Sequence, residues 1–287
     1  MIRALSRGTT RVVVVVLALS VAGSVTAAPD GIVPLARAHA HNDYLHPRPL
    51  LDALDAGFTS VEADVWLVDG ELFVAHDRSA IRPARTLRTL YLEPLRRIVR
   101  EHDGHVHRGY PYPVILLVDI KSEAEATYRV LDTQLSAYRP MLTAMPASGV
   151  RLGAVLVIVS GNRPRDFMLG QTERLAGYDG RSTDLGGPLA SSFMPLVSDN
   201  WMLRFAWMGI GPMPEDERRR LAGIVAAAHD RGQRVRFWAT PDSGPGAEAV
   251  WTVLLRAGVD YINADRLAAL RAFLLRMDPS RSQLIVR

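Results

Sequence analysis

Apolar residues recur along the chain in two patterns that predict helices and strands in alternation. One pattern occurs three times, at residues 49–67, 219–240 and 250–267: an apolar stripe at helical spacing is followed by a glycine and then by a short apolar strand. The glycines stand where a left-handed residue commonly ends a helix: Gly57, Gly232 and Gly258. Each stretch therefore predicts a helix that leads directly into a strand.

Two further segments, residues 112–122 and 152–162, are apolar at nearly every position. Strands of that kind are buried on both faces, which is typical of a parallel sheet. Helical patterns follow them at 123–138 and, more weakly, at 163–169. Residues 177–192 are rich in glycine and serine and predict a long loop.

Strands and helices that alternate over this length predict an α/β fold. A single (β/α)8 barrel, or TIM barrel, is favoured over an open doubly wound sheet, because the first strand-to-helix turn lacks a glycine-rich dinucleotide-binding loop. No Pro/Ser/Gly-rich linker divides residues 28–287, so we expect one domain there. In such barrels the catalytic side chains lie at the C-terminal ends of the strands.

The N-terminal segment is set apart by its charge and hydropathy. Arg3, Arg7 and Arg11 precede the apolar run 12–25, and small residues follow, which is typical of a signal peptide at 1–27. The run is shorter than the roughly 20 residues that span a bilayer, so secretion is favoured over the alternative, a membrane anchor.

Charge and cysteine content limit the partners and the chemistry. Loss of the three leader arginines would change the net charge from +4 to +1 (4 − 3 = 1), so the high pI indicates no nucleic-acid partner. The chain has no cysteine, which excludes disulfides and a thiol catalyst.

Carboxylates occupy alternate positions of one predicted strand. Glu62 and Asp64 point to one face, and the apolar residues around them point to the other. Buried carboxylates side by side are costly without a cation, and Mg²⁺ and Ca²⁺ are hard ions that take oxygen ligands. The pair therefore predicts a divalent metal ion, Mg²⁺ or Ca²⁺, rather than two solvated acids on an edge strand.

Asp119 and Lys121 repeat this spacing at the end of a purely apolar strand. Lys121 is the one lysine in a chain that otherwise uses arginine. A site that needs a compact ammonium rather than a planar fork explains the exception, with chance as the alternative. We expect Lys121 to contact a phosphate oxygen and Asp119 to be a third carboxylate ligand.

Histidines and tryptophans complete the candidate residues. His39, His41 and His76 lie at or near predicted strand ends, where barrel enzymes carry general acids and bases. His102, His105 and His107 lie in a polar turn and are expected to be solvated, with metal chelation as the alternative, whereas His46 and His229 are expected to be structural. Four tryptophans are candidates to line an apolar mouth: Trp66, Trp201, Trp207 and, at a strand end, Trp238. Tryptophans are, however, more often buried in a core.

Five short motifs, in order, resemble those of the phosphatidylinositol phospholipase C-like and glycerophosphodiester phosphodiesterase superfamily. They are HAHNDY (39–44), EADV (62–65), VAHD (74–77), DIK (119–121) and GVDYINAD (258–265). Each motif is weak alone, but together they span most of the chain after the leader. The first three look most like the Aim6-like branch, named after altered inheritance of mitochondria protein 6. The resemblance implies a single distorted TIM barrel.

The resemblance also implies an activity and the residues that perform it. A phosphodiester of the glycerophosphodiester or phospholipid-headgroup type would be hydrolysed with two histidines as general acid and base. The acid/base pair would be His39 and His76. The metal ligands would be Glu62, Asp64 and Asp119, and Lys121 would contact the phosphate. His41 is the alternative first histidine. The family's usual "H-R-G" and "E-N-T" are absent, so its phosphate-contacting arginine and first-strand glutamate have no counterpart, and Asn42 or Asp43 are the candidates to replace them.

Two other classes of protein remain open. The H-x-H pair His39 and His41 also suggests a metal-dependent amidohydrolase, but such a site needs histidine ligands from later strands, and after Lys121 the chain has His229 alone. A non-catalytic binding protein on a degenerate barrel is the other alternative. The intact set of acids, histidines and lysine argues against it, whereas the missing "H-R-G" and "E-N-T" leave it open.

Overall fold

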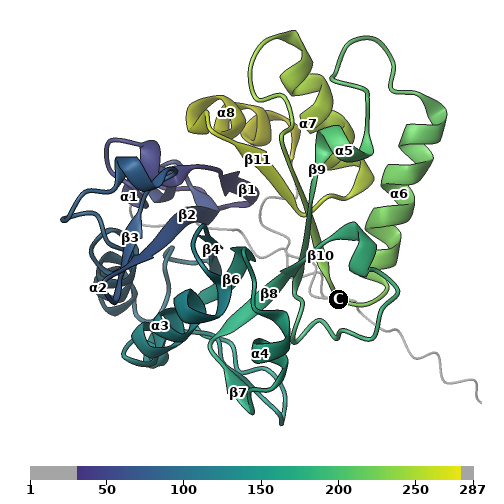
Figure 1. Ribbon diagram of the computed structural model, residues 1–287. Helices are drawn as coiled ribbons and strands as arrows, with labels where there is room; N and C mark the ends of the chain where they lie inside the picture. The colour runs from purple at the N-terminus through teal and green to yellow at the C-terminus, as the bar shows by residue number, and fades with distance from the viewer. Residues whose placement is uncertain (1–30, 279–287) are drawn as a thin grey trace, which may run out of the picture.

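The computed structural model describes residues 31–278, in which eight parallel strands close into one barrel. The first strand pairs with both the second and the last, so the barrel has no open edge (Figure 1). Around the barrel, the strands follow one another in chain order: β1 Leu35–Ala40, β2 Phe58–Val68, β4 Val114–Ile120, β6 Val155–Gly161, β8 Ala176–Gly180, β9 Leu196–Asn200, β10 Arg234–Trp238 and β11 Tyr261–Ala264.

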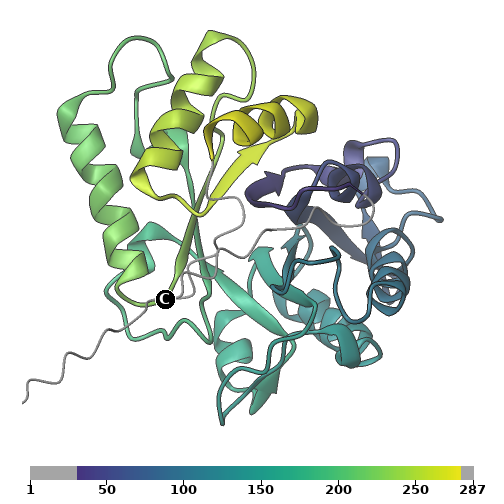
Figure 2. The ribbon, with the colours of Figure 1, turned by 180° about the vertical axis from the view of Figure 1, so that it is seen from behind.

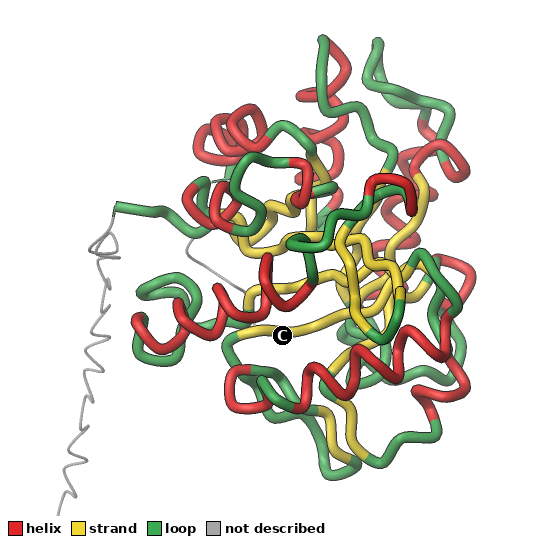
Figure 3. Tube along the Cα trace, turned by 60° about the vertical axis from the view of Figure 1, so that its left-hand side comes forward, coloured by secondary structure: helices red, strands yellow, loops and turns green. Residues whose placement is uncertain are grey.

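Helices surround the barrel on the outside (Figures 2 and 3). The first four long helices lie between successive barrel strands in the sequence, whereas the last follows β11 and contacts β1: α2 Glu93–Glu101, α3 Ala124–Ser136, α6 Glu215–His229, α7 Pro245–Ala257 and α8 Leu267–Met277. The others are one turn or little more: α1 Leu51–Asp55, α4 Arg165–Leu169 and α5 Trp201–Arg204. Between β8 and β9 the connection holds a 3-10 turn, Ser182–Asp184, and the ring of helices is therefore incomplete there.

Additional strands distort the regular pattern. β3 (Glu71–Val74) pairs antiparallel with the outer end of β2 and lies outside the barrel. β5 (Met145–Pro146) and β7 (Glu173–Arg174) form a separate two-stranded sheet. The predicted single distorted TIM barrel is therefore confirmed. The predicted signal peptide, residues 1–27, lies outside the described residues. Within 31–278, no helix has the length and hydropathy required to cross a membrane.

The predicted helix-to-strand units are confirmed. Gly57, Gly232 and Gly258 each have a positive φ, as expected for the residue after a helix end. At Gly57 a side chain would also clash, because an added Cβ would lie 2.2 Å from the carbonyl oxygen of Val33. The apolar segments 112–122 and 152–162 contain β4 and β6, which pair in parallel along seven residues.

Two predictions were wrong. Residues 177–192 are not one long loop, because most of β8 lies within the first four of them. Its glycines serve close packing: an added Cβ on Gly180 would lie 2.2 Å from the sulfur of Met194. His107 is not solvated but buried, and its Nε2 donates to the carbonyl oxygen of Phe58 at 2.9 Å.

The barrel interior changes from apolar to polar along its axis. Near the N-terminal ends of the strands the interior holds a small apolar cluster: Ile115, Leu117, Ile158, Leu196 and Tyr261. Two residues further along the same strands, the inward positions are polar: Asp119, Ser160, Ser198 and Asn263. Since side chains alternate along a strand, the apolar residues between them face the surrounding helices. The polar end is therefore the C-terminal mouth.

Candidate active site

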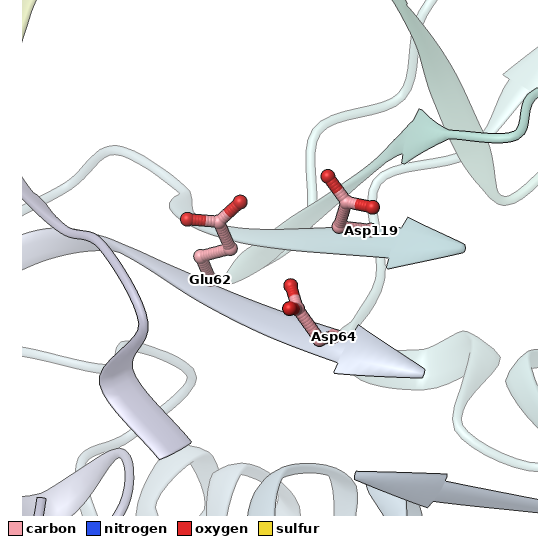
Figure 4. Close-up of side chains that lie close together, drawn as sticks. All are labelled: Glu62, Asp64 and Asp119. Atoms are coloured by element: carbon pink, nitrogen blue, oxygen red, sulfur yellow. The ribbon is translucent and has the colours of Figure 1, made fainter. Parts of the chain in front are cut away.

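Three carboxylates from two neighbouring strands meet at the mouth. Glu62 and Asp64 lie on β2, and Asp119 lies on β4 directly beside Asp64 in the register of the sheet (Figure 4). One oxygen of each lies within 4.8 Å of one oxygen of each other residue. Among residues 31–278 this is the one group of three or more Asp, Glu, His or Cys side chains with metal-ligand spacing. The period-two spacing that predicted Glu62 and Asp64 on one face of their strand also predicted Asp119 as the third carboxylate.

Two cations face the carboxylates from opposite sides. The Nζ of Lys121 is 3.2 Å from Oδ2 of Asp64 and 3.1 Å from Oδ1 of Asp119. The guanidinium of Arg236, whose side chain is 3% exposed, places Nη2 3.8 Å from Oε2 of Glu62. Three carboxylates against two cations leave the group with a net charge of about −1 when all are ionised.

The surroundings hold these acids at different pKa values. Burial and the charge of Glu62 raise the pKa of Asp64, and the same two causes raise the pKa of Asp119 to about 6. Burial opposes ionisation of Glu62 as well, but the charge of Arg236 and the neighbouring His39 outweigh it and keep its pKa below the usual range. Negative charge is thus crowded at Asp64 and Asp119, which is typical of a cation site.

His41 borders the cluster beside Glu62. Its Nδ1 donates to Oδ1 of Asp265 at 2.7 Å, and its Nε2 lies 3.7 Å from Oε2 of Glu62. Burial lowers its tendency to take a proton, but the bond to Asp265 prevails and raises its pKa. The side chain is 25% exposed. His41 therefore has one nitrogen fixed and the other directed at the site.

His39 lies one layer deeper in the barrel. It is 1% exposed, its Nδ1 is 2.7 Å from Oγ of Ser60, and its Nε2 has no hydrogen-bond partner in the described part of the chain. Burial and the charge of Arg236 lower its pKa to about 3. A neutral imidazole without access to solvent fits a supporting position.

His76 stands at the other end of the carboxylate pair. It follows β3, is 60% exposed, and has its Nδ1 3.1 Å from Oδ2 of Asp64. The hydroxyl of Tyr44 lies 2.7 Å from the same carboxylate oxygen and 3.2 Å from Nδ1 of His76. One accessible histidine therefore lies beside Glu62 and another beside Asp64.

The other predicted residues fall near the site or away from it. Asn42 lies next to the carboxylates rather than among them, because its Oδ1 accepts from Tyr44 and its Nδ2 donates to Asp265. Asp43 is buried and its Oδ2 accepts from the Leu50 amide and the Tyr91 hydroxyl, so it is not a ligand. Of the tryptophans, Trp201 and Trp207 belong to the core, whereas Trp238 is half-buried at the end of β10.

Three residues of the site were not assigned from the sequence: Tyr44, Arg236 and Asp265. Arg236 stands in the strand RVRFW, where it shares a face with Trp238, and that alternation was a usable signal. Asp265 was noted at a strand end, but its partner His41 is 224 positions away. Tyr44 stands within HAHNDY without any pattern that indicates a contact to Asp64.

Comparison with known proteins identifies the fold. Residues 234–268 match the glycerophosphoryl diester phosphodiesterase family. A solved glycerophosphoryl diester phosphodiesterase from Parabacteroides distasonis superposes with a TM-score of 0.50 at 14% identity, over 86% of this chain and 88% of that one. The fold is thus that of the glycerophosphodiester phosphodiesterase-like TIM barrels.

The sequence identifies a particular family among the proteins with this fold. Residues 26–179 match the AIM6-like phosphodiesterase domain. The altered inheritance of mitochondria protein 6 of Eremothecium gossypii is 31% identical over 83% of this chain and 69% of its own length. The Arthroderma benhamiae homolog is 28% identical over 85% of each chain. The chain belongs to the AIM6-like phosphodiesterase domain family, and the predicted superfamily and branch are confirmed.

Proposed function

We propose that this chain is a divalent-metal-dependent phosphodiesterase that hydrolyses a glycerophosphodiester or a phospholipid headgroup. The observation that carries the proposal is the placement of two accessible histidines, His41 and His76, at opposite ends of the carboxylate pair of β2. A general base and a general acid on either side of a reacting phosphorus need this arrangement.

The residues present fit a hard divalent ion. Glu62, Asp64 and Asp119 supply carboxylate oxygens within 4.8 Å of one another, and Oε2 of Glu62 is buried without a hydrogen-bond partner in residues 31–278. Mg²⁺ and Ca²⁺ both accept such ligands. When bound, the ion would balance negative charge on the phosphodiester oxygens. A site of three carboxylates without histidine favours this reading over an amidohydrolase.

His41 and His76 are the acid/base pair in this proposal. One takes the proton of the attacking water or hydroxyl through its exposed nitrogen, and the other gives a proton to the leaving alkoxide. Asp265 and Asp64 fix the Nδ1 atoms, so that the Nε2 atoms face the substrate. We propose His41 rather than His39 as the acid/base partner of His76, because His39 is too deeply buried to contact a substrate.

Lys121 and Trp238 act on the substrate rather than on the proton. The ammonium of Lys121, held between Asp64 and Asp119, is a point charge for a phosphate oxygen. Trp238 offers an apolar face at the mouth for the alcohol portion of the substrate. The partner is thus a small-molecule or lipid-headgroup phosphodiester. We further propose, from the N-terminal sequence pattern alone, that the protein is exported.

A substrate screen tests this function. Purified protein is incubated with a glycerophosphodiester, a lysophospholipid, phosphatidylinositol or sphingomyelin, with divalent ion or with EDTA, and the released alcohol is measured. We expect turnover of at least one diester, abolished by EDTA. Metal binding without turnover of any diester would instead support a non-catalytic binding protein on this barrel.

A further inference from the structure

Two arginines meet at the rim of the barrel, on the strands next to the carboxylates. Arg163 follows β6 and Arg181 follows β8, and the Nη1 atoms of both donate to the backbone carbonyl of Asp179. β4, β6 and β8 are consecutive in the barrel wall (Figure 1). Because neighbouring strands lie about 4.8 Å apart, the backbone of β8 lies roughly 10 Å from that of β4, and β6 lies between them.

A buried carboxylate turns one of these arginines toward the mouth. Asp179 is 0% exposed and faces the barrel interior, where its Oδ2 accepts from Oγ of Ser160 at 2.7 Å. The same oxygen accepts from Nη1 of Arg181 at 3.0 Å. Ser160 in turn pairs in register with Asp119. The guanidinium of Arg181 therefore lies over the interior polar layer that contains the carboxylates.

The second arginine has no acidic partner. Within residues 31–278, no Asp or Glu oxygen pairs with Arg163 at salt-bridge distance. Its guanidinium instead lies over the ring of Tyr178 at 4.8 Å from the centroid, and its Nε is buried without a hydrogen-bond partner. The ring contact fixes the direction of the fork without neutralising its charge.

Both guanidinia are anchored through one nitrogen each. The hydrogen bonds of Arg181 to Asp179 and Gly180 all use Nη1, and the side-chain hydrogen bond of Arg163 in the described chain does too. Their remaining donors are unused within the described chain, while the side chain of Arg181 is 25% exposed. Of the two adjacent cations, Arg181 alone pairs with a carboxylate in the described chain, so together they carry an excess positive charge. A fork with spare donors suits a carboxylate or phosphate.

We propose that Arg163 and Arg181 form a subsite for a second anionic group, so that the preferred substrates are phosphodiesters whose alcohol portion also carries a carboxylate or a phosphate monoester. The strands that carry these arginines are one and two strand spacings from β4, which a small polar headgroup can span. The assignment of this anion to a substrate rests on the proposed phosphodiesterase function, whereas anion binding itself does not.

Direct binding is measured by calorimetry with inorganic phosphate in EDTA, so that no divalent ion contributes. The variants are Arg163→Gln and Arg181→Lys, the second chosen because it keeps the charge that pairs with buried Asp179. The control is Arg97→Gln/Arg100→Gln, two exposed arginines of α2. We expect phosphate affinity to fall about tenfold or more in each variant and to stay at the wild-type value in the control. Equal affinity in all proteins would overturn the subsite.

Matched substrates then identify the anion. Glycerophosphoserine is compared with glycerophosphoethanolamine, which lacks the carboxylate, and glycerophosphoinositol 4-phosphate with glycerophosphoinositol. We expect the ratio of kcat/KM within one pair to exceed about ten in the wild type and to approach one in Arg163→Gln. Ratios near one in both pairs for the wild type would overturn the substrate assignment. Absence of all turnover with intact phosphate binding would contradict the phosphodiesterase function instead.

Discussion

The ammonium of Lys121 lies 3.2 Å from Oδ2 of Asp64, a carboxylate on the neighbouring strand. The same Nζ lies 3.1 Å from Oδ1 of Asp119. Burial disfavours the charged lysine, but the two carboxylates prevail and raise its pKa. Lys121 is therefore held as a permanent cation between two of the three proposed ligands.

Replacement of this lysine by arginine is expected to reduce turnover although the charge is kept. The planar guanidinium is larger than an ammonium and cannot occupy the same gap without displacing a carboxylate. We expect Lys121→Arg to lower kcat by about 10²-fold, the usual effect of removing one positioned charge. Steady-state kinetics measure it, and wild-type kcat in Lys121→Arg would assign the residue a structural role.

The carboxylates are expected to bind the divalent ion. Glu62→Gln/Asp64→Asn keeps the side-chain shapes but removes two negative charges, so Mn²⁺ binding by calorimetry should be lost while the far-UV circular dichroism is retained. The matched control is Glu101→Gln/Asp103→Asn, which changes two exposed acids at and just after the end of α2. Unchanged Mn²⁺ affinity in the site variant would show that the ligands lie elsewhere.

The histidines are expected to separate into two groups. His41→Ala and His76→Ala should each lower kcat by roughly two to four orders of magnitude, because each removes a proton-transfer group. The double variant should lose less than the sum, since groups that act as one unit are not additive. His39→Ala should mainly lower the free energy of unfolding, since it empties a buried position. A kcat in His39→Ala as low as in His41→Ala would reverse this assignment.

The buried acid next to Asn42 is expected to make stability depend on pH. Burial raises the pKa of Asp43 to about 6, whereas in the unfolded chain it ionises near pH 4. The folded state thus holds the proton more tightly, and stability should fall as pH rises from about 4 to about 6 and then level off, by up to about 3 kcal/mol. Urea unfolding should show a smaller decrease in Asp43→Asn than in the wild type, because Asp119, whose pKa is also raised to about 6, contributes to both.

Much of the fold followed from local patterns, and the exceptions have physical causes. Period-two alternation identified Glu62 and Asp64, and left-handed glycines marked the helix ends. β8 was missed because Gly177 and Gly180, which permit close packing against Pro195 and Met194, are also typical of loops. The strand was therefore mistaken for a loop because glycine occurs both in loops and at close contacts within sheets.

The site was predicted less completely because its contacts are long-range. Asp265 reaches His41 only after barrel closure brings β11 beside β1, and the sequence carries no signal for that pairing. Likewise, the depth that distinguishes His39 from His41 depends on where each lies along the barrel axis. Residue types and spacing identified the chemistry, whereas access to the substrate required the three-dimensional arrangement.

The most direct test of the account is ³¹P NMR of glycerophosphocholine incubated with metal-stripped protein, before and after addition of Mg²⁺ or Ca²⁺. We predict that the diester resonance stays constant without metal, is converted to a product resonance after one of the ions is added, and stays constant in Glu62→Gln/Asp64→Asn under all conditions. Conversion at the same rate in excess EDTA, or by the double variant, would contradict a phosphodiesterase that depends on a metal held by these carboxylates.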